Sequence, residues 1–187
     1  MNIERIVFLL EELSAKKMIE IIIPKLTKIK FDAYHFQGKQ DLEKNITKKI
    51  QNWQAPNTVF VIIRDQDSEN CKNVKNRLTQ LCKKAGKENC YLVRIACHEL
   101  ESFFLGDLDA VKSAGYKIKL SKKFSKGYSN PDSLSNASDE LTKITYNEYQ
   151  KVQGSTKIAP FLKLDGSNKS DSFNMLLKGI KKIITVQ

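Results

Sequence analysis

The sequence contains no apolar run as long as the roughly 18 to 20 residues that a membrane-spanning helix requires. It also lacks the charged n-region, long h-region and cleavage site of a secretory signal peptide, because Glu11-Glu12 interrupts the first apolar stretch. Internal repeats and low-complexity tracts are absent as well. We therefore expect a cytoplasmic protein that has no membrane partner.

Metal-binding cysteine motifs and nucleotide-binding loops are missing too. The four cysteines are separated by 11, 8 and 7 positions, so no C-x-x-C pair is available for a zinc knuckle. We expect reduced thiols that fill apolar space. The phosphate-loop pattern G-x-x-x-x-G-K-[ST] does not occur. The two histidines have no evident catalytic partner, which favours packing or surface roles for His35 and His98.

Positive charge is abundant and unevenly distributed. The chain of 187 residues has a net charge of +11, and its length suits one domain. Residues 1–111 hold 18 Lys and Arg against 15 Asp and Glu, whereas residues 112–187 hold 14 against 6. Lysine-rich surfaces bind phosphate backbones through counterion release, so DNA or RNA is the expected partner. A merely solvated lysine-rich surface is the alternative.

The first half alternates apolar strand patterns with amphipathic helix patterns, which predicts an α/β fold with a mostly parallel sheet flanked by helices. Helices are expected at 15–28, at 41–53 and from about 68 to 85, with Ser14 as the first N-cap and Asp67 or Ser68 as the third. The four predicted strands are Ile3–Leu10, Phe31–Phe36, Thr58–Arg64 and Tyr91–Cys97.

The pattern weakens after about residue 111. Residues 117–128 are basic, 138–149 and 170–184 are predicted helices, and 151–170 are expected to be irregular. We therefore interpret residues 1–111 as the α/β core. Residues 112–187 would be a basic helical extension packed on that core within a single globular unit.

Acidic residues follow the first, the third and the fourth of the predicted strands. Glu11 and Glu12 follow the first strand, and Asp65-Gln66-Asp67 follows the third. Because the carboxyl ends of parallel strands share one edge of a sheet, these side chains are expected to converge there. Carboxylates suit Mg²⁺ or Mn²⁺ beside a substrate phosphate. We expect Glu11, Asp65 and Asp67 to be catalytic, and Glu11, Glu12, Asp65 and Asp67 to be metal ligands.

Structural roles for the same acids stay open at this point. Asp67 is also a candidate N-cap for the next helix. Glu11 and Glu12 also suit an acidic first helical turn, which complements the helix dipole.

Four further residues are candidates for substrate binding. Lys39 follows Gly38 between a strand and a helix, where backbone N–H groups and a lysine can hold a phosphate; an ordinary turn is the alternative. Glu99 follows the fourth strand, and helical geometry would place Glu101 about 200° away from it, so only one of them can face the site. Lys151 and Ser170 supply polar groups able to reach back over the strand edge, although Ser170 also suits a helix N-cap.

The acid after the first strand and the D-x-D after a later strand resemble the Toprim pattern. The Toprim fold is shared by topoisomerases, bacterial primases and overcoming-lysogenization-defect nucleases. The chain is even more similar to a family of small bacterial Toprim-like proteins described only as a domain of unknown function. Glu12 departs from the glycine that usually follows the Toprim acid. Besides the acids, the resemblance rests on residues 36–42, 94–107, 151–155 and 170–174.

This resemblance implies a divalent-metal nuclease site at Glu11, Asp65 and Asp67. It also implies an ATPase partner of the ABC or structural-maintenance type, and a role in antiphage defence. The leading hypothesis is a Mg²⁺-dependent phosphodiester hydrolase. A non-catalytic subunit of such an ATPase is the alternative, and a receiver-type phosphoacceptor is a third possibility that requires a lysine after a fifth strand.

Overall fold

The protein forms a four-stranded parallel sheet within the residues that the structure, a computed structural model, describes: 2–87, 90–119 and 129–185. The strand order is β2-β1-β3-β4, and all three pairings are parallel. The sheet is flanked by helices, which confirms the predicted α/β class with a mostly parallel sheet. The strands are β1 (Arg5–Leu10), β2 (Lys30–His35), β3 (Thr58–Asp65) and β4 (Tyr91–Ala96).

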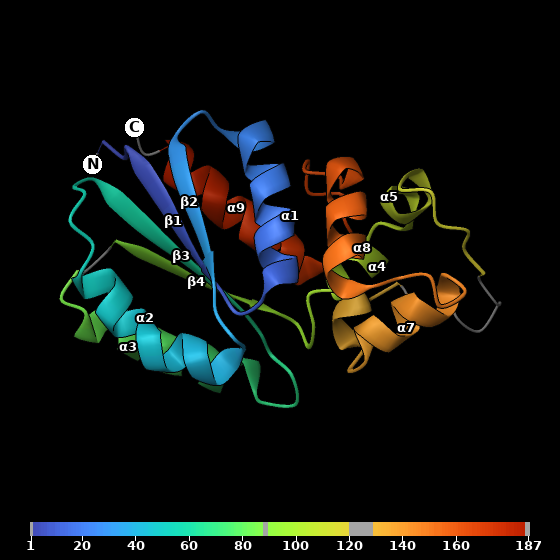
Figure 1. Ribbon diagram of the computed structural model, residues 1–187, viewed down its shortest axis with the longest axis horizontal. Coiled ribbons are helices and arrows are strands. Elements are labelled where there is room, and N and C mark those ends of the chain that lie inside the picture. The colour runs from blue at the N-terminus through green and yellow to red at the C-terminus, as the bar shows by residue number, and fades with distance from the viewer. Residues whose placement is uncertain (1, 88–89, 120–128, 186–187) are drawn as a thin grey trace.

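Long helices cover both faces of the sheet (Figure 1). Helices α1 (Leu13–Leu26) and α9 (Asp171–Thr185) lie on one face, whereas α2 (Lys39–Gln51) and α3 (Cys71–Lys84) lie on the other. Because successive strand residues point to opposite faces, each strand contributes to two apolar layers. Val61 and Ile63 pack with α1, and Phe60 and Ile62 pack with α2 and α3.

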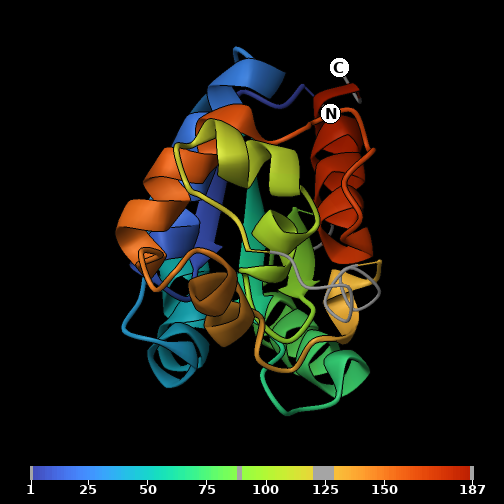
Figure 2. The same ribbon diagram turned by 90° about the vertical axis from the view of Figure 1, so that its right-hand side faces the viewer.

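A group of short helices lies in front of the carboxyl ends of the strands (Figure 2). Helix α8 packs on α1, and α9 packs on β4. The apolar core that contains Phe8 of β1 extends without a break to Phe103, Leu141 and Ile158 of this group. The short helices are α4 (Ser102–Leu105), α5 (Leu108–Ser113), η1 (Pro131–Ser133), α7 (Ala137–Ile144), α8 (Lys151–Ile158) and η2 (Ala159–Phe161).

The prediction of an irregular stretch at 151–170 was wrong over its first part, which forms α8 and η2. Gly154 and Ser155 weaken the sequence signal for a helix there. Tertiary packing stabilises α8 instead, because Gly154, Ser155 and Ile158 are buried and the ring of Tyr149 lies directly against Gly154. Most of the predicted basic stretch, residues 120–128, lies outside the described residues.

Two predicted helix caps were also wrong. Helix α1 starts at Leu13 with Glu12 as its N-cap residue, so Ser14 lies inside the helix, where its hydroxyl donates to the Glu12 carboxylate. Helix α3 is capped by Asn70, whose side-chain oxygen accepts from the N–H groups of Lys72 and Asn73. Asp67 is therefore not an N-cap.

Two classes of protein find no support in the described part of the chain. The sheet has no fifth strand there, so the lysine position that a receiver-type phosphoacceptor needs is missing. Among the helices that the structure describes, none combines the length and the apolar character needed to cross a bilayer.

Replacing Gly106 by alanine should destabilise the fold. A Cβ at Gly106 would lie 2.0 Å from Asn168 Oδ1 and 2.7 Å from the backbone nitrogen of Ser170. We expect Gly106→Ala to reduce the free energy of unfolding by about 2 kcal/mol and Tm by roughly 4–8 °C, measured by thermal and urea unfolding. In Gly166→Ala the new Cβ meets no atom within 4 Å, but φ is +99°, so this control should lose only about 1 kcal/mol. Equal losses in both variants would contradict the packing argument.

Candidate active site at the carboxyl edge of the sheet

The paired ends of β1 and β3 bring Glu11 and Asp65 together. Leu10 is in register with Ile63, and the backbone N–H of Glu11 donates to the Ile63 carbonyl over 3.2 Å. In return, the backbone N–H of Asp65 donates to Glu11 Oε2 over 3.0 Å. The two predicted strand-end acids therefore share one edge of the sheet, and they are held there by backbone geometry.

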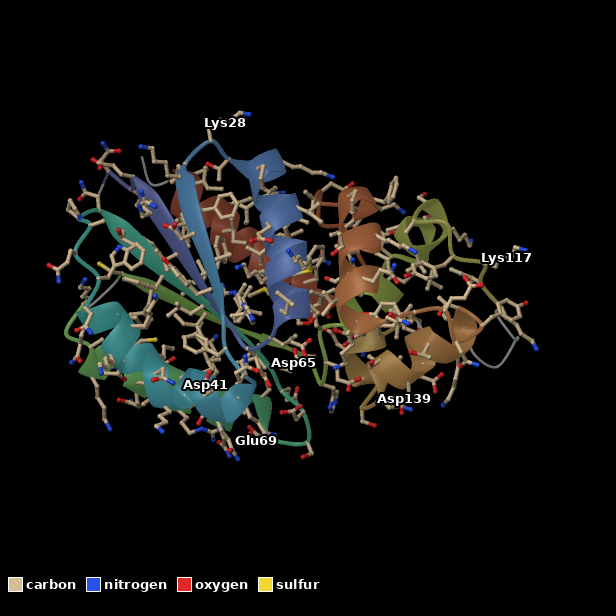
Figure 3. The ribbon with its side chains drawn as sticks, viewed as in Figure 1. Lys28, Asp41, Asp65, Glu69, Lys117 and Asp139 are labelled. Carbon is tan, nitrogen blue, oxygen red and sulfur yellow. The ribbon has the colours of Figure 1, made fainter. Side chains whose placement is uncertain are left out.

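Asp65 is a buried acid whose charge is poorly compensated. It is 9% exposed, and its carboxylate makes no hydrogen bond or ion pair with another described residue. Figure 3 shows it at the end of the sheet that faces the short helices. Burial raises the pKa of Asp65 well above its ordinary value, and the charges of Glu12, Glu101 and Glu11 raise it further. Lys151 acts in the opposite direction.

Lys151, the first residue of α8, is surrounded by these acids. Its ammonium lies 3.9 Å from Glu12 Oε2. Burial opposes its charge, but Glu101, Glu12 and Asp65 together raise the pKa of Lys151. Because its pKa is raised, Lys151 stays charged and partly offsets the repulsion among the acids.

Glu101 is fully buried beside this lysine. Its Oε1 accepts a hydrogen bond from the Tyr149 phenol over 2.9 Å, whereas its Oε2 is buried without a hydrogen-bond partner. Burial raises the pKa of Glu101, Lys151 lowers it and Glu12 raises it again. We name Glu11, Glu12, Asp65 and Glu101 the carboxylate cluster.

Asp67 faces a different set of partners. Its Oδ2 lies 2.9 Å from Lys39 Nζ and 3.6 Å from Nη2 of the fully buried Arg64. Its backbone has a φ of +56°, and it exchanges two hydrogen bonds with His98: the Asp67 N–H donates to the His98 carbonyl over 2.8 Å, and His98 Nδ1 lies 3.0 Å from the Asp67 carbonyl. Asp67 is thus held beside two cations at the rim of the cluster.

Glu11 lies between two groups of charged residues. The Lys151 group consists of Lys151, Glu12, Asp65 and Glu101, and the Asp67 group consists of Asp67, Lys39 and Arg64. Its Oε2 is 3.8 Å from Arg64 Nε. Burial raises the pKa of Glu11; the Asp65 N–H lowers it, the Asp67 charge raises it and Arg64 lowers it. Glu11 is therefore the carboxylate that connects the Lys151 group to the Asp67 group.

The residues predicted to bind substrate have different surroundings. Lys39 begins α2 directly after Gly38, whose N–H donates to the Glu11 carbonyl over 3.1 Å, so this turn adjoins the cluster. Glu99 Oε2 accepts from the Ser138 N–H over 2.7 Å near the start of α7.

Ser170 is buried; its hydroxyl donates to Asp132 over 2.6 Å and accepts from the Phe173 N–H at the start of α9. None of the hydrogen bonds of Ser170 reaches the cluster.

The cluster suits a hard divalent cation in its donor chemistry. Glu101 Oε2 has no hydrogen-bond partner, and the Asp65 carboxylate is unpaired among the described residues. Carboxylate oxygens of this kind are the donors that Mg²⁺ and Mn²⁺ prefer. Across the described residues, no three Asp, Glu, His or Cys side chains already surround a common point as ligands. The match to such an ion is therefore one of charge and donor type alone, because the described side chains do not form a metal site as they stand.

Sequence reasoning missed Glu101 and Tyr149. Helical periodicity separated Glu99 from Glu101 but could not tell which of them faces the site. One signal was available, because Glu101 stands among Leu100, Phe103 and Phe104, and an acid within an apolar run is rarely buried unless a partner or a function keeps it there.

Replacing Asp65 by asparagine should stabilise the metal-free protein. At pH values between the ordinary pKa of an aspartate and the raised pKa of Asp65, the native state keeps a proton on Asp65 that the unfolded state has lost. The free energy of unfolding therefore falls as pH rises through this range. At neutral pH we expect Asp65→Asn, measured in EDTA, to increase the free energy of unfolding by about 1 kcal/mol and Tm by roughly 2–4 °C.

The gain should shrink in acid, where Asp65 of the natural protein is itself protonated. Asp139→Asn is the matched control, because Asp139 is exposed on α7. It should leave Tm nearly unchanged. A loss of stability in Asp65→Asn at neutral pH would show that the Asp65 charge is compensated in solution.

Comparison with known proteins identifies the fold and the family. No curated protein matches the sequence. The C-terminal region of the Xanthomonas campestris pv. campestris OLD protein is 14% identical, with a TM-score of 0.54, and the match covers 97% of this chain and 96% of that one. The C-terminal region of the Burkholderia pseudomallei OLD protein is 16% identical, with a TM-score of 0.54, and the match covers 99% and 100%. At these identities the similarity shows a common fold.

A family model matches residues 5–181, from the start of β1 into α9. The match therefore includes both the Lys151 group and the Asp67 group. The chain belongs to the family described as Domain of unknown function (DUF4276).

Proposed function

We propose that this protein is a divalent-metal-dependent phosphodiester hydrolase, a nuclease that acts on DNA or RNA. The observation that carries the proposal is the burial of Asp65 among Glu11, Glu12 and Glu101 with Lys151 as the adjoining cation. Acids with raised pKa values that gather at the ligand-binding edge of a parallel sheet are typical of catalytic sites. The fold shared with OLD C-terminal regions supports the same class.

The proposal assigns the carboxylate cluster to Mg²⁺ or Mn²⁺, with Asp65 and Glu11 as the central pair. A bound divalent ion would stabilise negative charge on the phosphate and lower the pKa of a bound water. Glu11 has a raised pKa and lies at the junction of the two groups, so it would accept the proton of the attacking water. Asp67 would act at the rim, where it orients Lys39.

Two lysines on opposite sides of the cluster would bind the nucleic-acid backbone. Lys39 starts α2 and Lys151 starts α8, and 44% of each side chain is exposed. Both stand at helix N-termini, where free N–H groups also favour phosphate. Glu99 and Ser170 would support this surface indirectly, because their hydrogen bonds hold the starts of α7 and α9 in place.

The basic C-terminal part would extend the binding surface. Residues 112–187 carry most of the net positive charge, and their short helices lie over the strand ends. A backbone that crosses the carboxylate cluster would therefore meet lysines on both sides.

A separate ATPase is the proposed partner. The OLD structures are the C-terminal regions of their proteins, and this chain matches them over nearly its whole length. Together with the Toprim-like resemblance, this supports joint action with an ATPase of the ABC or structural-maintenance type in antiphage defence. A non-catalytic subunit of that ATPase is the second candidate, which the pairing of Asp67 with Lys39 and Arg64 favours.

Nuclease assays should show loss of activity when the cluster is altered. We expect the purified chain, with Mg²⁺ or Mn²⁺ and the partner ATPase when one is required, to cleave plasmid, single-stranded DNA or tRNA. Asp65→Asn and Glu11→Gln should each lower the rate roughly 10²-fold or more. Asp139→Asn should retain full activity. Full activity in Asp65→Asn would reject the site, and no cleavage under any condition would favour the subunit role.

Thermal unfolding should detect the metal without relying on activity. Saturating Mn²⁺ at about 100 times Kd should stabilise the protein by about 2.7 kcal/mol, which is roughly 5–10 °C in Tm. Asp65→Asn and Glu101→Gln should lose most of this shift, whereas Asp139→Asn should keep it. An equal shift in all variants would place the ion elsewhere on the protein.

A further inference from the structure

Two half-buried cysteines lie on one cavity beside the candidate site. Cys71 is the first residue of α3, and Cys97 follows β4. Both line a cavity of about 250 Å³, together with Lys75, Arg94, Ser172 and Met175. Helix α3 packs directly beside β4, so the two thiols belong to neighbouring elements that are far apart in sequence.

Neither thiol is part of a disulfide, and the Cys71 thiol is close enough to influence the pKa of Cys97. Burial raises the pKa of Cys97 to about 11, and Asp132 and the adjacent Cys71 thiol contribute in the same direction. The other two cysteines are placed differently: Cys82 is fully buried eleven residues further along α3, and Cys90 precedes β4 at the other end of that strand.

The pair also adjoins the two segments that hold Asp67. One segment is the turn from β3 to α3, which ends at Cys71. The other starts at Cys97 and includes His98, which exchanges two hydrogen bonds with Asp67. A covalent link between Cys71 and Cys97 would therefore join the same two segments that the Asp67–His98 hydrogen bonds join.

We propose that Cys71 and Cys97 form an oxidation site at which a peroxide converts the two thiols to a disulfide. Because its raised pKa keeps Cys97 protonated, the attacking thiolate is that of Cys71. It attacks a peroxide oxygen; an S–O bond forms, the O–O bond breaks, and the product is a sulfenic acid plus hydroxide, which takes up the thiol proton to give water. The second thiol attacks the sulfenic sulfur and releases a second water as the S–S bond forms. The two thiols lose two electrons and the peroxide gains them.

This assignment differs from the expectation that all four cysteines are inert fillers. In a reducing compartment such a disulfide would be transient, which is the behaviour of redox-sensing pairs. Its effect would be to fix the Asp67 turn against the segment after β4. The proposal does not depend on nuclease activity, because it concerns thiol chemistry and the stability of the contact between the Asp67 turn and the segment after β4.

Peptide mapping after peroxide treatment tests the pair. The reduced chain is treated with hydrogen peroxide, the remaining thiols are alkylated under denaturing conditions, and non-reduced peptides are examined by mass spectrometry. We expect one cross-linked peptide pair that contains Cys71 and Cys97, together with alkylated Cys82 and Cys90. The oxidised chain should melt roughly 5 °C or more above the reduced chain, and a reductant should reverse the shift.

Matched serine variants distinguish the outcomes. Cys71→Ser and Cys97→Ser should each abolish both the cross-link and the shift in Tm, whereas Cys90→Ser should keep them. If Cys97→Ser fails to fold, Cys71→Ser at the half-buried start of α3 gives the same answer. Four alkylated thiols after oxidation, or a cross-link that includes Cys82 or Cys90, would overturn the proposal.

Discussion

The parallel pairing of β1 with β3 is the constraint on which the site depends. It brings the Asp65 N–H to the Glu11 carboxylate and so places two acids from distant parts of the chain at one strand edge. Alternation along β3 then sends neighbouring residues to opposite faces. Asp65 continues the face that packs with α1, and Arg64 continues the face that packs with α2 and α3. One strand end thus supplies a buried acid to one side and a buried cation to the other.

This division explains why the C-terminal part belongs to the site. The acids on the α1 side need a positive charge, and Lys151 on α8 supplies one. Helix α8 packs on α1 through a buried face, and its position is fixed by the contact of Gly154 with Tyr149. Tyr149 in turn holds Glu101. Even so, burial raises the pKa values of Asp65, Glu11 and Glu101, so the fold keeps poorly compensated acids, which is typical of sites selected for function over stability.

Sequence patterns predicted the sheet and the convergence of its strand-end acids, because buried parallel strands give long apolar runs and each strand end fixes the position of the next residues along the chain. They could not predict which acid of Glu99 and Glu101 faces inward, since that choice depends on packing against Tyr149. Helix α8 was missed for the same reason. The pairing of Asp67 with Lys39 joins residues 28 positions apart, and no local pattern encodes such a contact.

The position where this chain departs from the Toprim pattern changes the balance of charge at the site. Where Toprim proteins usually have a glycine, Glu12 serves as the N-cap residue of α1, and its carboxylate contacts Ser14 and Lys151. The departure thus adds an acid on the α8 side. Asp67, on the other side, is already beside Lys39 and Arg64. A divalent cation is attracted most where negative charge is least compensated. That region is the one around Asp65 and Glu101, so a divalent ion bound as we propose would lie nearer α8 than the D-x-D motif alone implies.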